Sequence, residues 1–166
     1  MKLWSDIFKH KHTWIRGVDV DLSHCTRSDL PSTVKTYKGD QACSILAEKI
    51  VNVRKAHIVI DDASHLSSKT IASFETWWPR VRDGGLYVVE DTHCSYDTDY
   101  YGWSESSVPG LDAPNTPHYK FTTMGFLKRL ADDVNWNYHG YNRFEPLFRD
   151  IAFVHFYPGI TFIGKK

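Results

Sequence analysis

The sequence contains few cysteines and no cluster of them. Cys25, Cys43 and Cys94 are odd in number, lie far apart and form no Cys-x-x-Cys pair. A disulfide framework or a structural zinc site is therefore not expected. Thiols that need no partner are typical of reducing compartments, so the cysteine content predicts a cytoplasmic protein.

Long apolar runs and blocks of like charge are also missing. No stretch approaches the roughly 20 apolar residues of a membrane span, and the amino end has no signal-peptide pattern. The 20 basic residues balance the 20 acidic ones without forming a Lys/Arg stripe, which argues against nucleic acids and anionic membranes as partners. With 166 residues, 42% of them hydrophobic, the chain predicts a single globular domain over 1–166.

The apolar pattern alternates between the periods of strands and helices. Strands are expected at residues 13–19, 33–37, 57–60, 86–89, 151–157 and 160–163, and helices near 42–51, 67–78 and 121–134. Ser67 or Ser68 is a candidate cap of the second helix, and Asp83-Gly84-Gly85 is expected to be a turn. This order predicts an α/β fold whose mostly parallel sheet ends in an antiparallel hairpin.

Carboxylates follow four successive strands of the predicted sheet. They are Asp19 with Asp21, Asp40, Asp61 with Asp62, and Glu90 with Asp91. One acid in such a place is often a turn residue or a helix cap. Carboxylates after four strands at one sheet edge repel one another, so a cation, ligand hydroxyls or adenine amines should compensate their charge. Ligands of α/β sheets bind at this edge. We therefore expect a functional site there.

The sharpest group consists of Asp62, His65, Glu90 and Asp91. If their two strands are neighbours, three carboxylates converge, and oxygen ligands select Mg²⁺, Mn²⁺ or Ca²⁺. His65 could be a further ligand, but an imidazole with an ordinary pKa of about 6.5 is better suited to remove a proton. A structural hydrogen bond near a helix start is the alternative for His65.

Two motifs carry a family resemblance. They read IDDASH at residues 60–65 and DGGLYVVEDTHCSY at residues 83–96. Each is weak alone, but together they resemble the metal-dependent sugar O-methyltransferases of antibiotic biosynthesis, such as the mycinamicin, macrocin and rhamnosyl O-methyltransferases. Ala63 is a mild departure, since this family usually has glycine there.

The resemblance implies a Rossmann-like class I methyltransferase sheet that binds S-adenosylmethionine (SAM). It places Asp19 on the ribose hydroxyls of SAM. It places Asp40 and Gln41 near the adenine, and Asp61 near the methyl donor.

The resemblance also implies a Mg²⁺ site and an acceptor. Asp62, Glu90 and Asp91 would hold Mg²⁺. His65 would be the base that deprotonates a sugar hydroxyl of a small-molecule glycoside before methyl transfer.

Methyltransferases of this fold open with a strand and a glycine-rich turn that precede the first helix. Trp4, Ile7 and Phe8 recur at helical spacing, so the chain is expected to begin within that helix. No GxGxxG stretch occurs in the sequence. The expectation is a methyltransferase domain without its first strand, truncated at the amino end.

Two other functions remain open at this stage. An inactive remnant of the fold would serve as a binding or assembly module, and formation of a homo-oligomer would cover the missing strand. A metal-dependent hydrolase or hydroxylase would use the same acids. An Fe(II) hydroxylase usually needs two histidines and one carboxylate, for which His93 is the candidate second ligand, although an exposed loop histidine is the preferred interpretation of His93.

Overall fold

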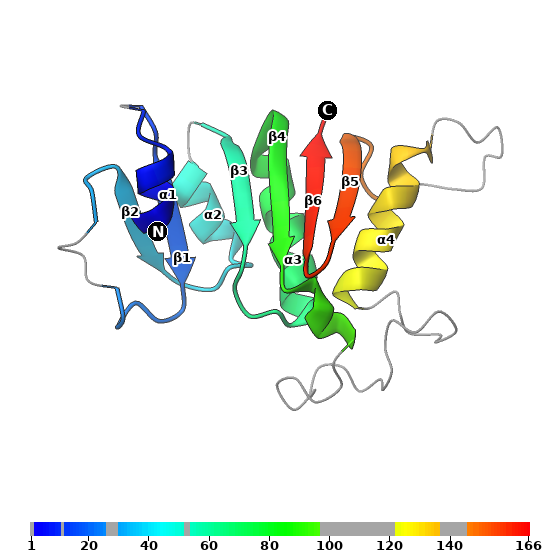
Figure 1. Cartoon of the computed structure of the whole chain (residues 1–166), viewed down its shortest axis with the longest axis horizontal. Helices are drawn as coiled ribbons and strands as arrows, with labels where there is room; N and C mark the ends of the chain where they lie inside the picture. Colours follow the sequence, from blue (N-terminus) through cyan, green and yellow to red (C-terminus); the bar gives the residue numbers. More distant parts are fainter. Residues whose placement is uncertain (1, 11, 26–29, 52–53, 97–121, 137–145) are drawn as a thin grey trace.

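The computed structural model describes residues 2–10, 12–25, 30–51, 54–96, 122–136 and 146–166 (Figure 1). The elements are α1 (Lys2–Ile7), β1 (Ile15–Asp19), β2 (Val34–Lys38), α2 (Ser44–Val51), β3 (Ala56–Asp61), α3 (Ser67–Trp77), the 3-10 turn η2 (Trp78–Arg80), β4 (Val81–Glu90), the 3-10 segment η3 (Thr92–Tyr96), α4 (Thr123–Val134), β5 (Ile151–Tyr157) and β6 (Ile160–Lys165). Within the described ranges, no helix has the length and apolarity needed to cross a membrane.

The strands of the described residues form two sheets. β1 and β2 pair in parallel, and the larger sheet has the order β3-β4-β6-β5. β3 and β4 are parallel, whereas β6 is antiparallel to both β4 and β5. The α/β class, the parallel pairing and the carboxyl-terminal hairpin are therefore confirmed. In Figure 1 the arrows of β1, β2, β3 and β4 point the same way, so their carboxyl ends lie at one edge of the molecule.

Strand β4 begins earlier than expected and contains the segment that was predicted to be a turn. Ala56 pairs with Val81 and Ile58 pairs with Leu86, so β3 advances two positions while β4 advances five. Gly84 lies within this bulge with φ of 70°, a backbone conformation that glycine adopts at little cost. The turn prediction was wrong because a bulge uses the same glycines without reversing the chain.

The core lies between the larger sheet and α3 and α4. Phe74 of α3 stacks on Trp78 at 5.1 Å between ring centroids and meets Tyr87, Phe126 and Phe148 edge to face at 4.9, 5.3 and 5.2 Å. Such aromatic pairs add about 0.5–1.5 kcal/mol each beyond the area they bury. The aromatic cluster therefore fixes α3 against β4, the strand that leads to Glu90 and Asp91.

The start of α3 differs from the expected serine cap. The N-cap residue is Leu66, and it makes no side-chain cap bond. The Ser67 hydroxyl instead accepts a hydrogen bond of 2.9 Å from the backbone N–H of Thr123 at the start of α4. Ser67 therefore ties two helices together, an interaction between residues 56 positions apart that local sequence does not reveal.

Candidate metal and donor site

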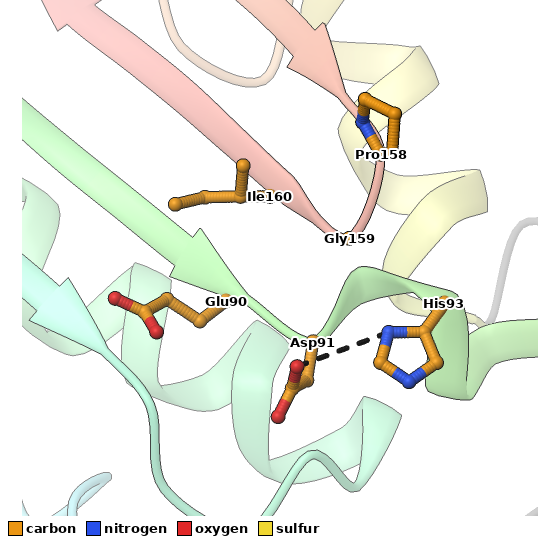
Figure 2. Close-up of a pocket in the computed structure, with 6 residues that line it drawn as sticks. All are labelled: Glu90, Asp91, His93, Pro158, Gly159 and Ile160. Carbon is orange, nitrogen blue, oxygen red and sulfur yellow. Dashed lines mark ion pairs between the residues drawn. The ribbon is translucent and has the colours of Figure 1, made fainter.

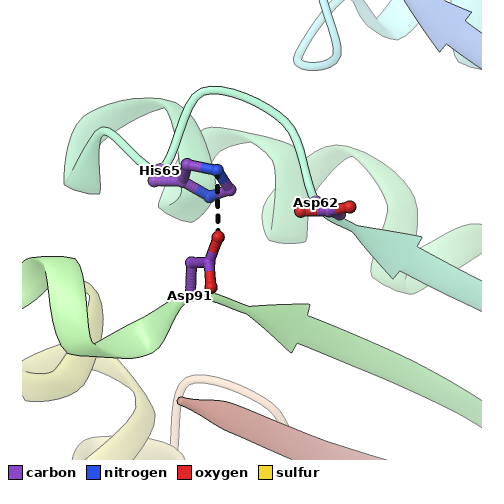
Figure 3. Close-up of side chains that lie close together, drawn as sticks. All are labelled: Asp62, His65 and Asp91. Carbon is purple, nitrogen blue, oxygen red and sulfur yellow. Dashed lines mark ion pairs between the residues drawn. The ribbon is translucent and has the colours of Figure 1, made fainter.

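Three predicted site residues meet where β3 and β4 end. Asp62, His65 and Asp91 each offer a ligand atom, and these atoms all lie within 4.8 Å of one another (Figure 3). The His65 Nε2 atom is 3.3 Å from the Asp91 Oδ2 atom. The pairing of β3 with β4 makes this possible, because it aligns the two strand ends from which Asp62 and Asp91 project.

Two residues of this group have a strained backbone. Among the described non-glycine residues, positive φ values occur at His65 (56°) and Asp91 (49°). The left-handed conformation costs a residue with a Cβ atom roughly 1–2 kcal/mol. Residues held this way persist where the surrounding structure imposes the conformation, and they cluster at functional sites.

Glu90 lies beside this group, outside the three residues with mutually close ligand atoms. Burial raises the pKa of its carboxyl group, and the negative charges of Asp62 and Asp91 raise it further, while His65 opposes them. A divalent cation would neutralise this accumulated negative charge. Carboxylates with one imidazole suit a hard cation such as Mg²⁺ or Mn²⁺, so the residues present fit the metal that the sequence predicted.

A pocket of about 540 Å³ opens next to the acids (Figure 2). Glu90, Asp91 and His93 line it from the β4 side, and the turn between β5 and β6 lines the other side with residues 158–160. The backbone N–H of Thr92 donates to the Gly159 carbonyl at 3.1 Å, which holds the turn against η3. The wall formed by the turn was not predicted, because the sequence does not show where the hairpin tip lies relative to β4.

His93 is exposed, as preferred on sequence grounds, and it also borders the pocket. Its Nδ1 atom is 3.8 Å from the Asp91 Oδ1 atom. Figure 2 shows the ring facing the Asp91 carboxylate across this gap. Asp91 therefore lies between two imidazoles, with His65 near one carboxylate oxygen and His93 near the other.

The residues predicted to bind SAM lie outside the three-residue metal group. Asp19, at the end of β1, is exposed, and its carboxylate accepts from the backbone N–H of Asp21 at 2.9 Å. Asp40 accepts from the backbone N–H of Ala42 at 2.8 Å and from Lys69 Nζ at 2.6 Å. The Lys69 hydrogen bond is the main cause of the lowered pKa of Asp40.

Asp61 and Gln41 are joined directly. The Gln41 side-chain amide donates to Asp61 Oδ1 at 2.9 Å, and the Tyr87 hydroxyl donates to Asp61 Oδ2 at 3.3 Å. Burial raises the pKa of Asp61 to about 6, although the hydrogen bonds from Ser73, Tyr87 and Gln41 oppose this shift. Both oxygens of the buried Asp61 carboxylate thus face neighbouring side chains.

The chain is similar to O-methyltransferases of two Streptomyces species. It is 29% identical over 169 residues to the 8-demethyl-8-alpha-L-rhamnosyl tetracenomycin-C 2'-O-methyltransferase of Streptomyces olivaceus, with 100% of this chain and 40% of the relative aligned. It is 33% identical over 135 residues to the demethylmacrocin O-methyltransferase of Streptomyces fradiae, with 81% of this chain and 30% of the relative aligned. No protein-family model matches the chain.

The solved structures that are similar to this chain also include a methyltransferase. The MycE methyltransferase from the mycinamycin biosynthetic pathway, in complex with Mg and SAH, superposes with a TM-score of 0.78 at 28% identity, covering 99% of this chain and 40% of MycE. Its complex with Mg, SAH and mycinamycin VI gives a TM-score of 0.76. The chain is a homologue of the sugar O-methyltransferases.

This sugar O-methyltransferase homologue corresponds to part of its relatives. It spans 30–40% of the two curated relatives named above and about 40% of MycE. Nearly the whole of the homologue takes part in the superposition. The fold and the family resemblance predicted from the two motifs are therefore confirmed.

The strain at Asp91 can be measured with two substitutions that both remove the carboxylate. In metal-free buffer we expect Asp91→Gly to be more stable than Asp91→Ala by about 1 kcal/mol, because glycine adopts φ of 49° at little cost. Urea unfolding of the two variants measures the difference. Equal stability, or a more stable alanine variant, would show that the backbone at Asp91 is not strained.

The raised pKa of Asp61 makes stability depend on pH. Its folded pKa of about 6 lies above the ordinary aspartate pKa of 3.8, so the folded state binds more protons between these values and stability falls as pH rises. Between pH 4 and pH 7 in a chelating buffer, the free energy of unfolding of the unaltered chain should fall by roughly 2–3 kcal/mol relative to that of the Asp61→Asn variant.

Urea unfolding at several pH values tests this expectation, with Asp6→Asn on the exposed face of α1 as the control. The Asp6→Asn curve should run parallel to that of the unaltered chain. If the difference in unfolding free energy between Asp61→Asn and the unaltered chain stays constant with pH, the raised pKa of Asp61 is contradicted.

Proposed function

We propose that this chain provides the metal-binding and acceptor-activating part of a SAM-dependent sugar O-methyltransferase. The observation that carries the proposal is the group of two carboxylates and one imidazole at the tips of β3 and β4, within 4.8 Å of one another. The homologues named above methylate glycosylated natural products, and MycE has Mg and SAH in its structure. The acceptor of this chain would accordingly be a sugar hydroxyl of a small-molecule glycoside.

Asp62 and Asp91 would hold Mg²⁺, and Glu90 would complete the set of acids. When bound, the ion lowers the pKa of the sugar hydroxyls and orients them. The raised pKa of Glu90 fits this role, since a carboxylate crowded by like charges gains most from a nearby cation.

His65 would act as the general base. Its Nε2 atom faces Asp91 at 3.3 Å, so the carboxylate orients the imidazole and stabilises it once it has accepted a proton. With Nε2–H directed at Asp91, the other ring nitrogen of His65 would take the proton from the acceptor hydroxyl as the oxygen attacks the methyl group of SAM. The bond from the methyl carbon to sulfur breaks as the bond to oxygen forms.

The donor would lie along β1, β2 and β3. Asp19, exposed at the tip of β1, would hold the ribose hydroxyls, and the loop containing Asp40 and Gln41 would line the adenine. Because Lys69 and Ala42 occupy the Asp40 carboxylate, we assign Asp40 to shaping this loop. Asp61 would stand next to the donor, with its carboxylate on Gln41.

The pocket beside Asp91 would receive the sugar. Its carboxylates face the hydroxyl-bearing side of such a ligand, and Ile160 with Pro158 offers an apolar wall. No disulfide joins Cys25, Cys43 or Cys94, a pattern typical of reducing compartments, so we place the protein in the cytoplasm.

A second candidate is a metal-binding module that does not bind SAM. The observation in its favour is that β1–β2 and β3-β4-β6-β5 form separate sheets in the described residues. Asp19 and the loop of Asp40 and Gln41 thus belong to a different sheet from the metal residues, and Asp61 alone of the predicted donor residues lies on the larger sheet. Calorimetric titration of the chain with SAM, with and without Mg²⁺, separates the candidates, because the module would bind the metal but not SAM.

Substitutions at the metal site should separate ligand from base. Asp62→Asn should weaken Mn²⁺ binding at least about tenfold, because an anionic ligand is lost. The Mn²⁺ affinity of His65→Gln should stay within about threefold of that of the unaltered chain. Its rate of methyl transfer should be about 10²–10⁴-fold lower than that of an active unaltered chain, because the general base is lost. Calorimetry with Mn²⁺ and a methyl-transfer assay measure the two effects.

Asp6→Asn, at an exposed position of α1, is the matched control and should bind Mn²⁺ like the unaltered chain. No Mn²⁺ binding by the unaltered chain would overturn the proposed function. A loss of affinity in His65→Gln equal to that in Asp62→Asn would reassign His65 as a ligand.

A further inference from the structure

A chain of hydrogen bonds runs through the core to the edge of the site. The Ser73 and Tyr87 hydroxyls are 3.0 Å apart, Tyr87 donates to Asp61 at 3.3 Å, and Asp61 accepts from Gln41 at 2.9 Å. Tyr87 is fully buried, while Ser73 and Asp61 are 2% and 7% exposed. At this depth water does not replace a lost bond, so each group depends on its protein partner.

The helix that carries Ser73 also holds the loop that carries Gln41. Lys69 binds the Asp40 carboxylate, and the indole N–H of Trp77 donates to the Gln41 carbonyl at 2.8 Å. Residues 69, 73 and 77 are spaced by four and therefore share one face of α3. The backbone of the loop is thus held by α3, while the side chain of Gln41 is held by Asp61.

Asp61 also precedes Asp62 directly. Asp61 is the last residue of β3 and is buried, whereas Asp62 is the first residue beyond the strand and is exposed in the metal group. A bonded Asp61 side chain limits rotation of the backbone that carries Asp62. The same carboxylate therefore restrains a predicted metal ligand through the main chain and Gln41 through a hydrogen bond.

We infer that Ser73 and Tyr87 are positioning residues that act through Asp61 and link the metal ligand Asp62 to Gln41 of the donor loop. This inference rests on the proposed function, since it requires the acids to bind Mg²⁺. Neither hydroxyl belongs to the three-residue metal group. Their effect on the metal is transmitted by the position of β3's tip.

The sequence offers a direct reporter, because Gln41 is the only glutamine. A chain labelled with ¹⁵N in glutamine side chains gives one pair of amide signals, and these report on the bond to Asp61. Addition of Mg²⁺ should shift this pair in the unaltered chain. In Tyr87→Phe the pair should move before any metal is added, the Mg²⁺-induced shift should shrink, and Mn²⁺ affinity measured by calorimetry should fall about fivefold.

Ser73→Ala is the second variant and should give a change in the same direction, because the Ser73 hydroxyl bonds both Tyr87 and Asp61. Trp78→Phe is the control. Trp78 belongs to the same aromatic cluster, and its substitution removes a partly buried hydrogen bond of 2.8 Å to Asp150, so it should lower the melting temperature at least as much as Tyr87→Phe. It should leave both the Gln41 signals and Mn²⁺ affinity unchanged.

The outcomes are distinguishable. If Tyr87→Phe lowers the melting temperature but keeps the Mn²⁺ affinity and the Gln41 signals of the unaltered chain, the hydrogen-bond chain serves stability alone and the inference is overturned. If Mg²⁺ does not move the Gln41 signals of a chain that binds Mn²⁺, the inference is overturned and the proposed function stands. If the unaltered chain binds no Mn²⁺, both are overturned.

Discussion

The parallel pairing of β3 with β4 is the interaction on which the site depends. Asp61 pairs with Val89, so the residues that follow each strand emerge together at the same edge. Asp62 and Asp91 meet there although 29 positions separate them in the sequence, and the turn after β3 brings His65 over Asp91. Mutual repulsion of these acids opposes the arrangement, and the parallel pairing of β3 with β4 maintains it.

Asp61 and Asp62 are adjacent in the sequence, but one side chain is buried and the other is exposed. Asp61 faces the core, where burial raises its pKa to about 6 and three side chains surround it. Asp62 faces the metal group and is exposed. The division falls at the end of the strand, because Asp61 is the last residue of β3 and Asp62 is the first residue beyond it. One residue can therefore hold the framework while its neighbour is available to a ligand.

The sequence was sufficient to predict features that depend on the spacing of apolar residues and on the rule that neighbouring parallel strands end at the same edge of a sheet. Apolar runs closed by acids predicted β3 and β4 and the approach of Asp62 to Asp91. Features that depend on distant contacts were not predictable. The bulge in β4 uses glycines that are equally suited to a turn, and the wall formed by Gly159 depends on how the hairpin tip docks on η3.

The left-handed backbone at His65 and Asp91 has a consequence for the evolution of such chains. A position that costs conformational energy keeps a side chain only while that side chain is useful, and glycine is favoured once it is not. Loss of metal binding would therefore release two positions at once toward glycine or asparagine. Related chains with glycine or asparagine at both positions would belong to lineages that kept the fold after metal binding was lost.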